Sequence, residues 1–435
     1  MHIHKHIIAI GLFFAGFQSM AQGQFTLEEA IELGMKSNYD IAVMNNNSEI
    51  AANNNTLGNA GMLPVIDINA SANFANNATK QKFYTGQDLD RKGVHSNNVT
   101  TGVYLTWTLF NGLKMFATHQ QLSALEGMGK LSSKIQIENT LESIITTYFN
   151  VVKQKQLING LEENIKISEE RLTIAQKKLD IGSGSKLDVL QAKTDMNAQT
   201  SLLIRQRTLL EELKTGLNQL VARPAETAFD VSDSIPVQFQ MNYEDLKTNY
   251  QKNNLNLLFA KENITLSAHQ LRATQGDISP VINLNANYLF SRAESGAGQL
   301  LFNRNLGFNY GLTATWRIFN GFNLNNRIKN AQLQVENATV NYNNVQSQIE
   351  QQLLVAFKHF QDDKKILDLE EDNLKLVKEA VNIALERFRI GSSNSIELKE
   401  IQQTYVDALV RLTEARYTAK VSETKLMKLN GNLVK

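Results

Sequence analysis

The chain contains no cysteine. This absence excludes disulfide bonds, thiolate metal sites, a cysteine nucleophile and the acylated cysteine of a lipoprotein. The chain also has no excess of charge of either sign, because it contains 44 Lys and Arg and 43 Asp and Glu. The resulting net charge of +1 gives no electrostatic reason to bind nucleic acid. After the N-terminus no apolar run reaches the roughly 20 residues of a transmembrane helix, so a mature membrane protein would have to be a β-barrel.

Residues 1–21 are typical of a cleaved secretory signal peptide. Lys5 supplies the basic start, residues 7–17 form an apolar run, and Ser19-Met20-Ala21 is a small-x-small cleavage site before Gln22. The alternative is an N-terminal membrane anchor. The apolar run is short for an anchor, because spanning a bilayer takes roughly 20 residues. We therefore expect a secreted mature chain that begins near Gln22.

The mature sequence is an internal duplication. At one constant offset, two motifs of the first half recur in the second: Thr106-Trp107 and 109–112 as Thr315-Trp316 and 318–321, and Ile181-Gly182-Ser183 as Ile390-Gly391-Ser392. The first repeat covers residues 22–222 and the second covers 243–435. The stretch between them, 223–242, contains Pro224 and Pro236 and is predicted to be a linker in the equatorial region. Two long copies indicate a pseudo-symmetric protomer rather than a solenoid, whose units are shorter and more numerous.

Each repeat contains two segments in which apolar and polar residues alternate. These segments are 64–74 and 99–110 in the first repeat and 280–290 and 306–319 in the second, so each repeat supplies one β-hairpin. Their connections, 75–98 and 291–305, are rich in Gly, Asn, Ser and charge, as extracellular loops are. A soluble, half-buried sheet would show the same alternation. The length of the runs, their terminal aromatic residues and the secretory signal favour a lipid-facing apolar band with a wet interior.

Four strands are too few to close a barrel. Unpaired edge groups in hydrocarbon cost several kcal/mol each, and known membrane barrels begin at about eight strands. Two copies would give eight strands and three would give twelve. Because an eight-stranded barrel is filled by its own side chains, a conducting pore favours three copies.

Long helical patterns follow the strands. Residues 113–179 and 322–388 contain no proline, and at about 1.5 Å per residue each helix would reach roughly 100 Å. Shorter helices, 27–61 and 243–276, lead into the strands. Gly182 and Gly391 are predicted to be the turns of two helical hairpins. Apolar residues spaced alternately by three and four mark a coiled-coil seam, which in the second repeat comprises Leu353, Ala356, Phe360, Leu367, Leu374, Val377, Val381, Ala384 and Phe388.

This duplicated order, with an Ile-Gly-Ser turn followed by Leu-Asp-Val-Leu-Gln-Ala at 187–192, resembles the TolC family of outer-membrane efflux proteins. The resemblance covers essentially the whole mature chain. It implies a mixed α and transmembrane β fold, in which a homotrimer forms a twelve-stranded β-barrel continued by a periplasmic α-helical coiled-coil barrel. The implied location is the outer membrane of a Gram-negative cell, in contact with its lipid. The implied role is a passive conduit, without cofactor or metal, for substrates that an inner-membrane pump delivers through a periplasmic adaptor, the membrane fusion protein.

The resemblance also assigns roles to the two predicted hairpin turns. In the family these turns form the periplasmic tip that contacts the adaptor, which here implies Gly182, Ser183, Gly391 and Ser392. The alternative is that the two glycines only terminate helices through a positive φ. Both interpretations are compatible.

Carboxylates just after the second turn form the entrance constriction in the family, and the matching residues are Glu397 and Glu400. Their first-repeat equivalents are Asp188 and Gln191. A ring of carboxylates from three copies would favour cations over anions. Asp188 three residues after Ser185, and Glu397 three residues after Asn394, also fit helix N-terminal capping boxes. We favour the cap for Asp188, whereas Glu400 has no capping position and is assigned to the pore. The family often has a basic residue beside the second turn, but Ser393 and Asn394 stand there in this chain. The sequence therefore does not decide whether salt bridges hold the entrance closed.

Two other functions are compatible with parts of the pattern. One is an exit duct for type I protein secretion, because the duct itself does not distinguish cargoes. The other is a non-conducting periplasmic coiled-coil scaffold. An enzyme is not expected, because the sequence has no Ser/His/Asp set, metal-ligand spacing or Gly-rich phosphate loop.

Overall fold

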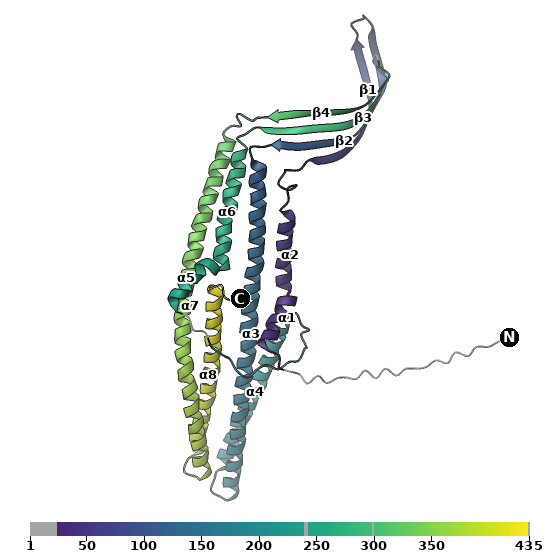
Figure 1. Cartoon of the computed structure of the whole chain (residues 1–435). Helices are drawn as coiled ribbons and strands as arrows, with labels where there is room; N and C mark the ends of the chain where they lie inside the picture. The colour runs from purple at the N-terminus through teal and green to yellow at the C-terminus, as the bar shows by residue number, and fades with distance from the viewer. Residues whose placement is uncertain (1–23, 239–241, 298–299, 434–435) are drawn as a thin grey trace, which may run out of the picture.

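The computed structural model describes residues 24–238, 242–297 and 300–433. The predicted signal peptide, 1–21, lies outside the described residues. The protein is elongated, with a four-stranded sheet at one end and long helices that run away from it to two hairpin turns (Figure 1). None of the helices in the described part of the chain combines the length and hydrophobicity that a membrane crossing requires.

The two halves repeat one order of elements: two short helices, two strands, one very long helix and one shorter helix. The long helices α3 and α7 contain 67 residues each, so each spans about 100 Å at about 1.5 Å per residue. The bounds in the first half are α1 Leu27–Ser37, α2 Tyr39–Asn54, β1 Val65–Lys82, β2 Asp88–Phe110, α3 Lys114–Asp180 and α4 Lys186–Leu220. Those in the second half are α5 Tyr243–Asn253, α6 Leu255–Gly276, β3 Val281–Ser295, β4 Phe302–Thr315, α7 Asn323–Arg389 and α8 Ser395–Leu429.

The helices that lead into the strands are broken, so the prediction of continuous helices over 27–61 and 243–276 is wrong. Asn38 ends α1 and caps α2, its Oδ1 accepting the N–H of Asp40 at 2.9 Å. Asn254 plays the same part between α5 and α6. Each asparagine also donates from Nδ2 to the last turn of its repeat's hairpin, to the carbonyl of Leu220 at 2.8 Å and of Leu429 at 3.0 Å. The breaks therefore fasten the short helices to the ends of α4 and α8.

The four strands form one antiparallel sheet in the order β1-β2-β3-β4. The predicted loops are shorter than expected. Strand β1 continues to Lys82 and β2 begins at Asp88, so most of 75–98 is strand; β3 reaches Ser295, and β4 runs from Phe302 to Thr315 rather than from 306 to 319. Pairing of β2 with β3 ends at Ser96. From there toward the β1–β2 turn, β1 and β2 continue as a two-stranded ribbon (Figure 1). Most residues of this ribbon are exposed, with Val94 as a buried exception, so its sequence has little reason to alternate.

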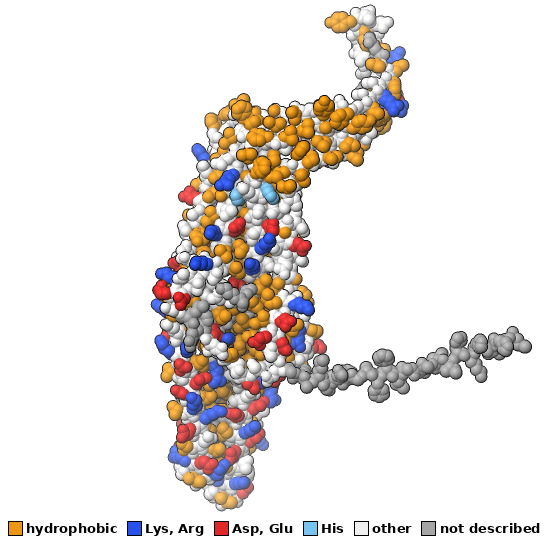
Figure 2. All heavy atoms as spheres, in the orientation of Figure 1, with side chains coloured by type: hydrophobic (Ala, Val, Ile, Leu, Met, Phe, Trp, Pro, Cys, Tyr) orange, Lys and Arg blue, Asp and Glu red, His pale blue; other side chains and the backbone are white. Residues whose placement is uncertain are grey.

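The sheet has one apolar and one polar face. Residues paired directly across strands point to the same side, and the register joins Ile68, Val103, Tyr288 and Phe308 on one face. These four side chains are 42–78% exposed. Figure 2 shows hydrophobic side chains spread across the sheet. On the other face amides and hydroxyls bond across strands, at Thr108–Asn283, Asn285–Thr313 and Asn287–Asn309. The predicted alternation is therefore present in the folded sheet.

The repeated Asn-Gly motif makes the turn from strand into long helix. Gly112 and Leu113 have φ values of 68° and 64°, and Gly321 and Phe322 have φ values of 67° and 62°. The asparagine before each glycine accepts the N–H four residues on, at 3.1 Å from Asn111 and 3.3 Å from Asn320. The two tryptophans brace the same junctions, because their Nε1–H groups bond to the carbonyls of Met62 and Ile278.

The helices pack on apolar seams, as the coiled-coil spacing predicts. Leu353, Ala356 and Phe360 are buried in α7 near the middle of the molecule, and Ala384 and Phe388 are buried near its far end. Residues 229–235 of the linker pack into the first repeat's core, where Val231 is fully buried. The α3–α8 contact joins the two repeats, and it leads to the hairpin turns.

Candidate functional site at the helical hairpin tips

Both hairpins end in the same glycine turn. Gly182 has φ +78° and Gly391 has φ +83°, and an added Cβ would meet nothing within 4 Å at either. These glycines are therefore required by backbone conformation and not by close packing. The following serine returns its N–H to the end of the long helix, from Ser183 to the carbonyl of Lys178 at 2.8 Å and from Ser392 to that of Arg387 at 2.9 Å, which closes the helix end.

The start of α4 confirms a cap at Asp188. The hydroxyl of Ser185 accepts the N–H of Asp188 at 3.1 Å, and the Asp188 carboxylate accepts the N–H of Ser185 at 3.2 Å. Two helix N-terminal donors are thus satisfied reciprocally. At α8 the arrangement differs, because Asn394 caps alone and accepts the N–H of Glu397 at 2.9 Å. The Glu397 carboxylate is free of capping and forms an ion pair with Arg387 of α7.

The four residues predicted for the entrance do not form one cluster. Glu400 is exposed, and its carboxylate has no hydrogen bond or ion pair among the described residues. Gln191 is exposed on α4, one turn from Asp195 toward the tip. At about 100° per residue, Glu397 and Glu400 lie roughly opposite the side of α8 that contacts the first hairpin. The two glutamates therefore point away from the first hairpin, and Glu397 contacts Arg387 of its own hairpin.

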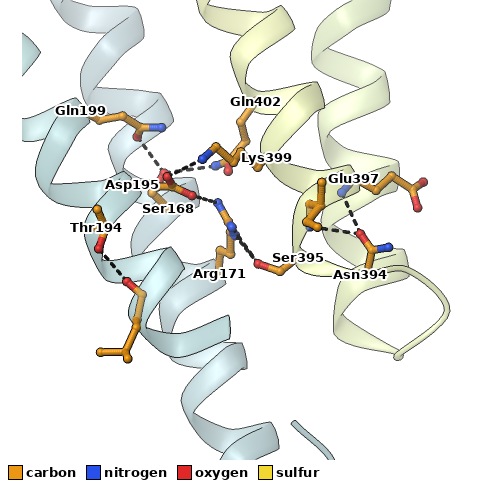
Figure 3. A network of polar contacts seen from close by, with 12 residues as sticks. Ser168, Arg171, Thr194, Asp195, Gln199, Asn394, Ser395, Glu397, Lys399 and Gln402 are labelled. Carbon is orange, nitrogen blue, oxygen red and sulfur yellow. Dashed lines mark hydrogen bonds and ion pairs between the residues drawn. The ribbon is translucent and has the colours of Figure 1, made fainter. Parts of the chain in front are cut away.

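A polar network that the sequence analysis missed joins the two hairpins close to their tips (Figure 3). Arg171 of α3 donates to Asp195 of α4 at 3.1 Å, and through Nε and Nη2 to the Ser395 hydroxyl of α8 at 3.1 and 2.7 Å. Lys399 of α8 reaches the other oxygen of Asp195 at 2.7 Å. The Arg171 side chain is 2% exposed and that of Asp195 is 16% exposed. One nearly buried carboxylate thus bridges two cations, one from each hairpin.

Further contacts cross the same seam on either side of the network. Toward the tip, Lys178 donates to the carbonyl of Phe388 at 2.5 Å, and Arg389 pairs with Glu170. Away from the tip, Glu163 of α3 accepts from Lys378 and from the hydroxyl of Tyr405, each at 3.1 Å. Polar contacts therefore bind the hairpins to each other over several helical turns.

The surroundings of these groups shift two pKa values. Burial acts to raise the pKa of Glu163, but its bonds with Lys378 and Tyr405 prevail and hold it below the ordinary value. Burial raises the pKa of Tyr405, and the charge of Glu163 raises it further. Glu163 is therefore anionic and Tyr405 neutral at physiological pH, which keeps this contact a charge-assisted hydrogen bond.

A hollow of about 560 Å³ lies between the two turns. It brings together three of the predicted residues, Ser183, Asp188 and Gly391, with the apolar side chains of Ile181 and Ile390. These isoleucines are 77% and 76% exposed, although they stand beside a turn that needs no apolar residue. Gly182 and Ser392 stand on the adjoining turns and are exposed. Across the described residues, no cluster of three or more His, Asp or Glu could hold a metal ion.

One sequence signal could have revealed the network. Arg171 lies on α3 next to Leu172 and four residues before Ala175, which is buried. A charged residue at a position that must be buried needs a partner. The sequence does not say that the partner is Asp195, because α4 runs back along α3 with a register that the turn sets.

Comparison with known proteins agrees with this duplicated architecture. A model of a family described as outer membrane efflux protein matches residues 31–223 and 248–432, one match for each repeat and together most of the chain. The chain belongs to the outer membrane efflux protein family. The predicted family is thereby confirmed, as is the prediction that the chain is not an enzyme. It is an outer-membrane efflux duct with a periplasmic helical extension.

Three relatives of this outer membrane efflux protein that are distant in sequence match nearly the whole chain. The outer membrane protein TolC of Escherichia coli (strain K12) is 20% identical over 98% of this chain and 86% of its own length. The proteases secretion protein PrtF of Dickeya chrysanthemi is 17% identical over 94% of this chain and 88% of its own. The solved Campylobacter jejuni CmeC outer membrane channel superposes with a TM-score of 0.77 at 18% identity, over 93% of this chain and 85% of that one.

Proposed function

We propose that three copies of this chain assemble into one duct, a twelve-stranded barrel in the outer membrane continued by a tube of helices in the periplasm. The observation that supports this most strongly is the open sheet. Strands β1 and β4 are its two edges, each with a row of backbone groups that no strand of the chain pairs. Because unpaired edges in hydrocarbon cost several kcal/mol per group, neighbouring copies must supply the missing pairing.

The polar face of the sheet supports an interior filled with water. It presents amides and hydroxyls, and Asp67 is its one charged side chain between 65 and 74. Twelve strands leave room for a channel, whereas eight strands are filled by side chains. A trimer with this lining gives substrates a hydrated path that carries little fixed charge.

We assign the periplasmic entrance to the hairpin tips. Glu397 and Glu400 point away from their own chain's first hairpin, which in a closed ring of three copies turns them toward the axis or a neighbouring copy. Glu400 has no partner among the described residues, while Glu397 shares its charge with Arg387. Glu400 is therefore the stronger candidate for an electrostatic filter that favours cations.

We also propose that the tip turns receive the periplasmic adaptor, which connects the duct to an inner-membrane pump. Exposed Ile181 and Ile390 flank the hollow between the turns. Paired apolar side chains beside a polar rim are the usual anchors of a protein interface. In this arrangement Gly182, Ser183, Gly391 and Ser392 supply backbone and hydroxyl groups around those anchors.

Protein export is the second candidate function. The match to a protein named for protease secretion extends over 94% of this chain, so the same duct suits an unfolded polypeptide. Nothing in the wall of the duct separates the two cargoes. The distinction lies in the pump and adaptor, which the proposed tip surface would select.

The test is the oligomeric state and conductance of the mature chain. Purified from membranes in detergent, it should migrate as a trimer that dissociates on heating, and it should form discrete channels in planar bilayers. A periplasmic fraction that contains the whole protein as a soluble monomer, with no channels, would instead favour the coiled-coil scaffold.

A further inference from the structure

Two arginines stand directly opposite each other at the outer end of the sheet's apolar face. Arg292 of β3 is the cross-strand partner of Arg304 of β4. Like charges in this relation destabilise a sheet. From these arginines back to the helical end, the apolar face of the described strands carries no Lys, Arg, Asp or Glu. Between this pair and the helical end the described strands place no other cation on this face, and two guanidiniums opposite each other call for an anion.

The chain compensates one of these two positive charges with its own carboxylate. Glu294 accepts from Nη2 of Arg292 at 2.5 Å and from its Nε at 3.1 Å. Among the described residues Arg304 has no carboxylate partner, and its guanidinium lies 5.5 Å from the ring centre of Phe290. Arg292 lies 5.4 Å from that of Phe302. One carboxylate against two guanidiniums leaves a net positive charge, next to the aromatic rings of Phe290 and Phe302.

The pair lies at a defined depth. From Ile282 to Arg292 the strand rises roughly 33 Å at about 3.3 Å per residue, and a strand tilt of about 40° reduces this to about 25 Å along the membrane normal. That is the height of the apolar band of an outer-membrane barrel. The β3–β4 connection lies at the end of the sheet away from the helices (Figure 1). With the helices in the periplasm, the arginines stand where the outer-leaflet headgroups begin.

We propose that Arg292 and Arg304 bind a phosphate group of an anionic glycolipid in the outer leaflet of the outer membrane. The inference rests on the proposed function, because only a lipid-facing sheet brings the pair to the headgroups. Planar guanidinium groups match a phosphate with paired donors. The lipid's acyl chains lie along Leu306 and Phe308, which are 53% and 63% exposed directly below the pair. This apolar floor distinguishes a lipid phosphate from a free one.

The test measures binding of fluorescent lipid A to the purified trimer in neutral detergent micelles. Each arginine near a membrane surface contributes about 1 kcal/mol, or about fivefold. Arg304→Gln should weaken binding about fivefold, and Arg292→Gln with Arg304→Gln about 25-fold. Arg317→Gln is the matched control, because this exposed arginine follows β4 at the helical end of the sheet; it should leave binding unchanged. Lipid A without its phosphates should bind the natural chain as weakly as phosphorylated lipid A binds the double variant.

Three results would overturn the inference: equal affinity of the double variant and the natural chain, an equal loss in Arg317→Gln, or complete displacement of lipid A by millimolar inorganic phosphate. The same preparations are assayed for heat-dissociable trimer and for conductance. A conducting trimer whose lipid binding ignores both arginines refutes this site and leaves the proposed function intact. A chain that forms no conducting trimer refutes both.

Discussion

Replacement of Asp195 by asparagine should loosen the duct at its periplasmic end. Asp195 is the single acid that holds Arg171 and Lys399 together across the two hairpins. Asparagine keeps the size and hydrogen-bonding capacity of the side chain but removes its charge. Arg171, at 2% exposure, then remains a nearly buried cation with no ion-pair partner.

The magnitude follows from this burial. Loss of one partner from a buried ion pair costs about 3–5 kcal/mol. Arg171 keeps its two bonds to the Ser395 hydroxyl, and Lys399 is exposed enough to return to water, so we expect about 2 kcal/mol less coupling between the hairpins. At about 1.4 kcal/mol per tenfold change, that moves the equilibrium between joined and separated tips about 30-fold toward separation.

Single-channel recording in planar bilayers measures this shift. The Asp195→Asn channel should show a higher open probability or a larger conductance than the natural one. The control is Glu162→Gln, which removes the exposed Arg207–Glu162 pair between α3 and α4 of one hairpin and should change little, because exposed pairs contribute about 0–1 kcal/mol. Equal conductance of all three proteins would refute the role of this network in closing the entrance.

Three further predictions concern the strand-to-helix turns, the glutamates at the tip and the buried Glu138 of α3. Gly112→Ala should destabilise the heat-dissociable trimer more than Gly321→Ala, because both need a positive φ but only at Gly112 would a Cβ meet an α6 backbone oxygen, at 2.2 Å; equal losses would contradict this account. Glu400→Gln should lower cation selectivity in bilayer reversal potentials more than Glu397→Gln, whose carboxylate is already paired, and the reverse order would exclude the assignment. Burial raises the pKa of Glu138 to about 7 from an ordinary 4.5, so the folded state loses stability as the pH rises from about 4.5 to about 7. Glu138→Gln should therefore raise the melting temperature at pH 8 but not at pH 4.

The duplicated motifs predict much of the fold. The Asn-Gly pairs identify the strand-to-helix turns, and the Ile-Gly-Ser pairs identify the hairpin tips, because each needs a positive φ that glycine supplies most easily. The long helices follow from seams spaced by three and four residues. These features are local, so a sequence displays them directly.

Features that depend on tertiary contact were missed or misplaced. The break at Asn38 is stabilised by its bond to the carbonyl of Leu220, which lies far along the chain. Lys36 and Asn38 recur as Lys252 and Asn254 in the second repeat. This recurrence is a sequence signal for the break, since a duplicated asparagine inside a helix favours a cap. The β1–β2 ribbon was missed because strands whose residues are mostly exposed have little apolar period.

The candidate site divides in the same way. The sequence predicts the turns and the Asp188 cap, which are set by residues three or four apart. It does not predict the pairing of Arg171, Asp195 and Lys399, which depends on the register of three helices. No basic residue stands at 393–394, and the ion pair of Glu397 is with Arg387 of the preceding helix, a contact across the turn that the sequence does not reveal.

In the proposed trimer, copies of this chain complete one another's sheet at β1 and β4. Because the chain has no natural cysteine, cysteine pairs placed on these two edges can be oxidised in intact cells without background. The measurement pairs Ser71→Cys on β1 with cysteine at each of 305–313 on β4 in turn. We expect a ladder of crosslinked dimers and trimers at matching registers and nothing larger. Monomers alone, or crosslinking that stops at two chains in every register, would contradict it.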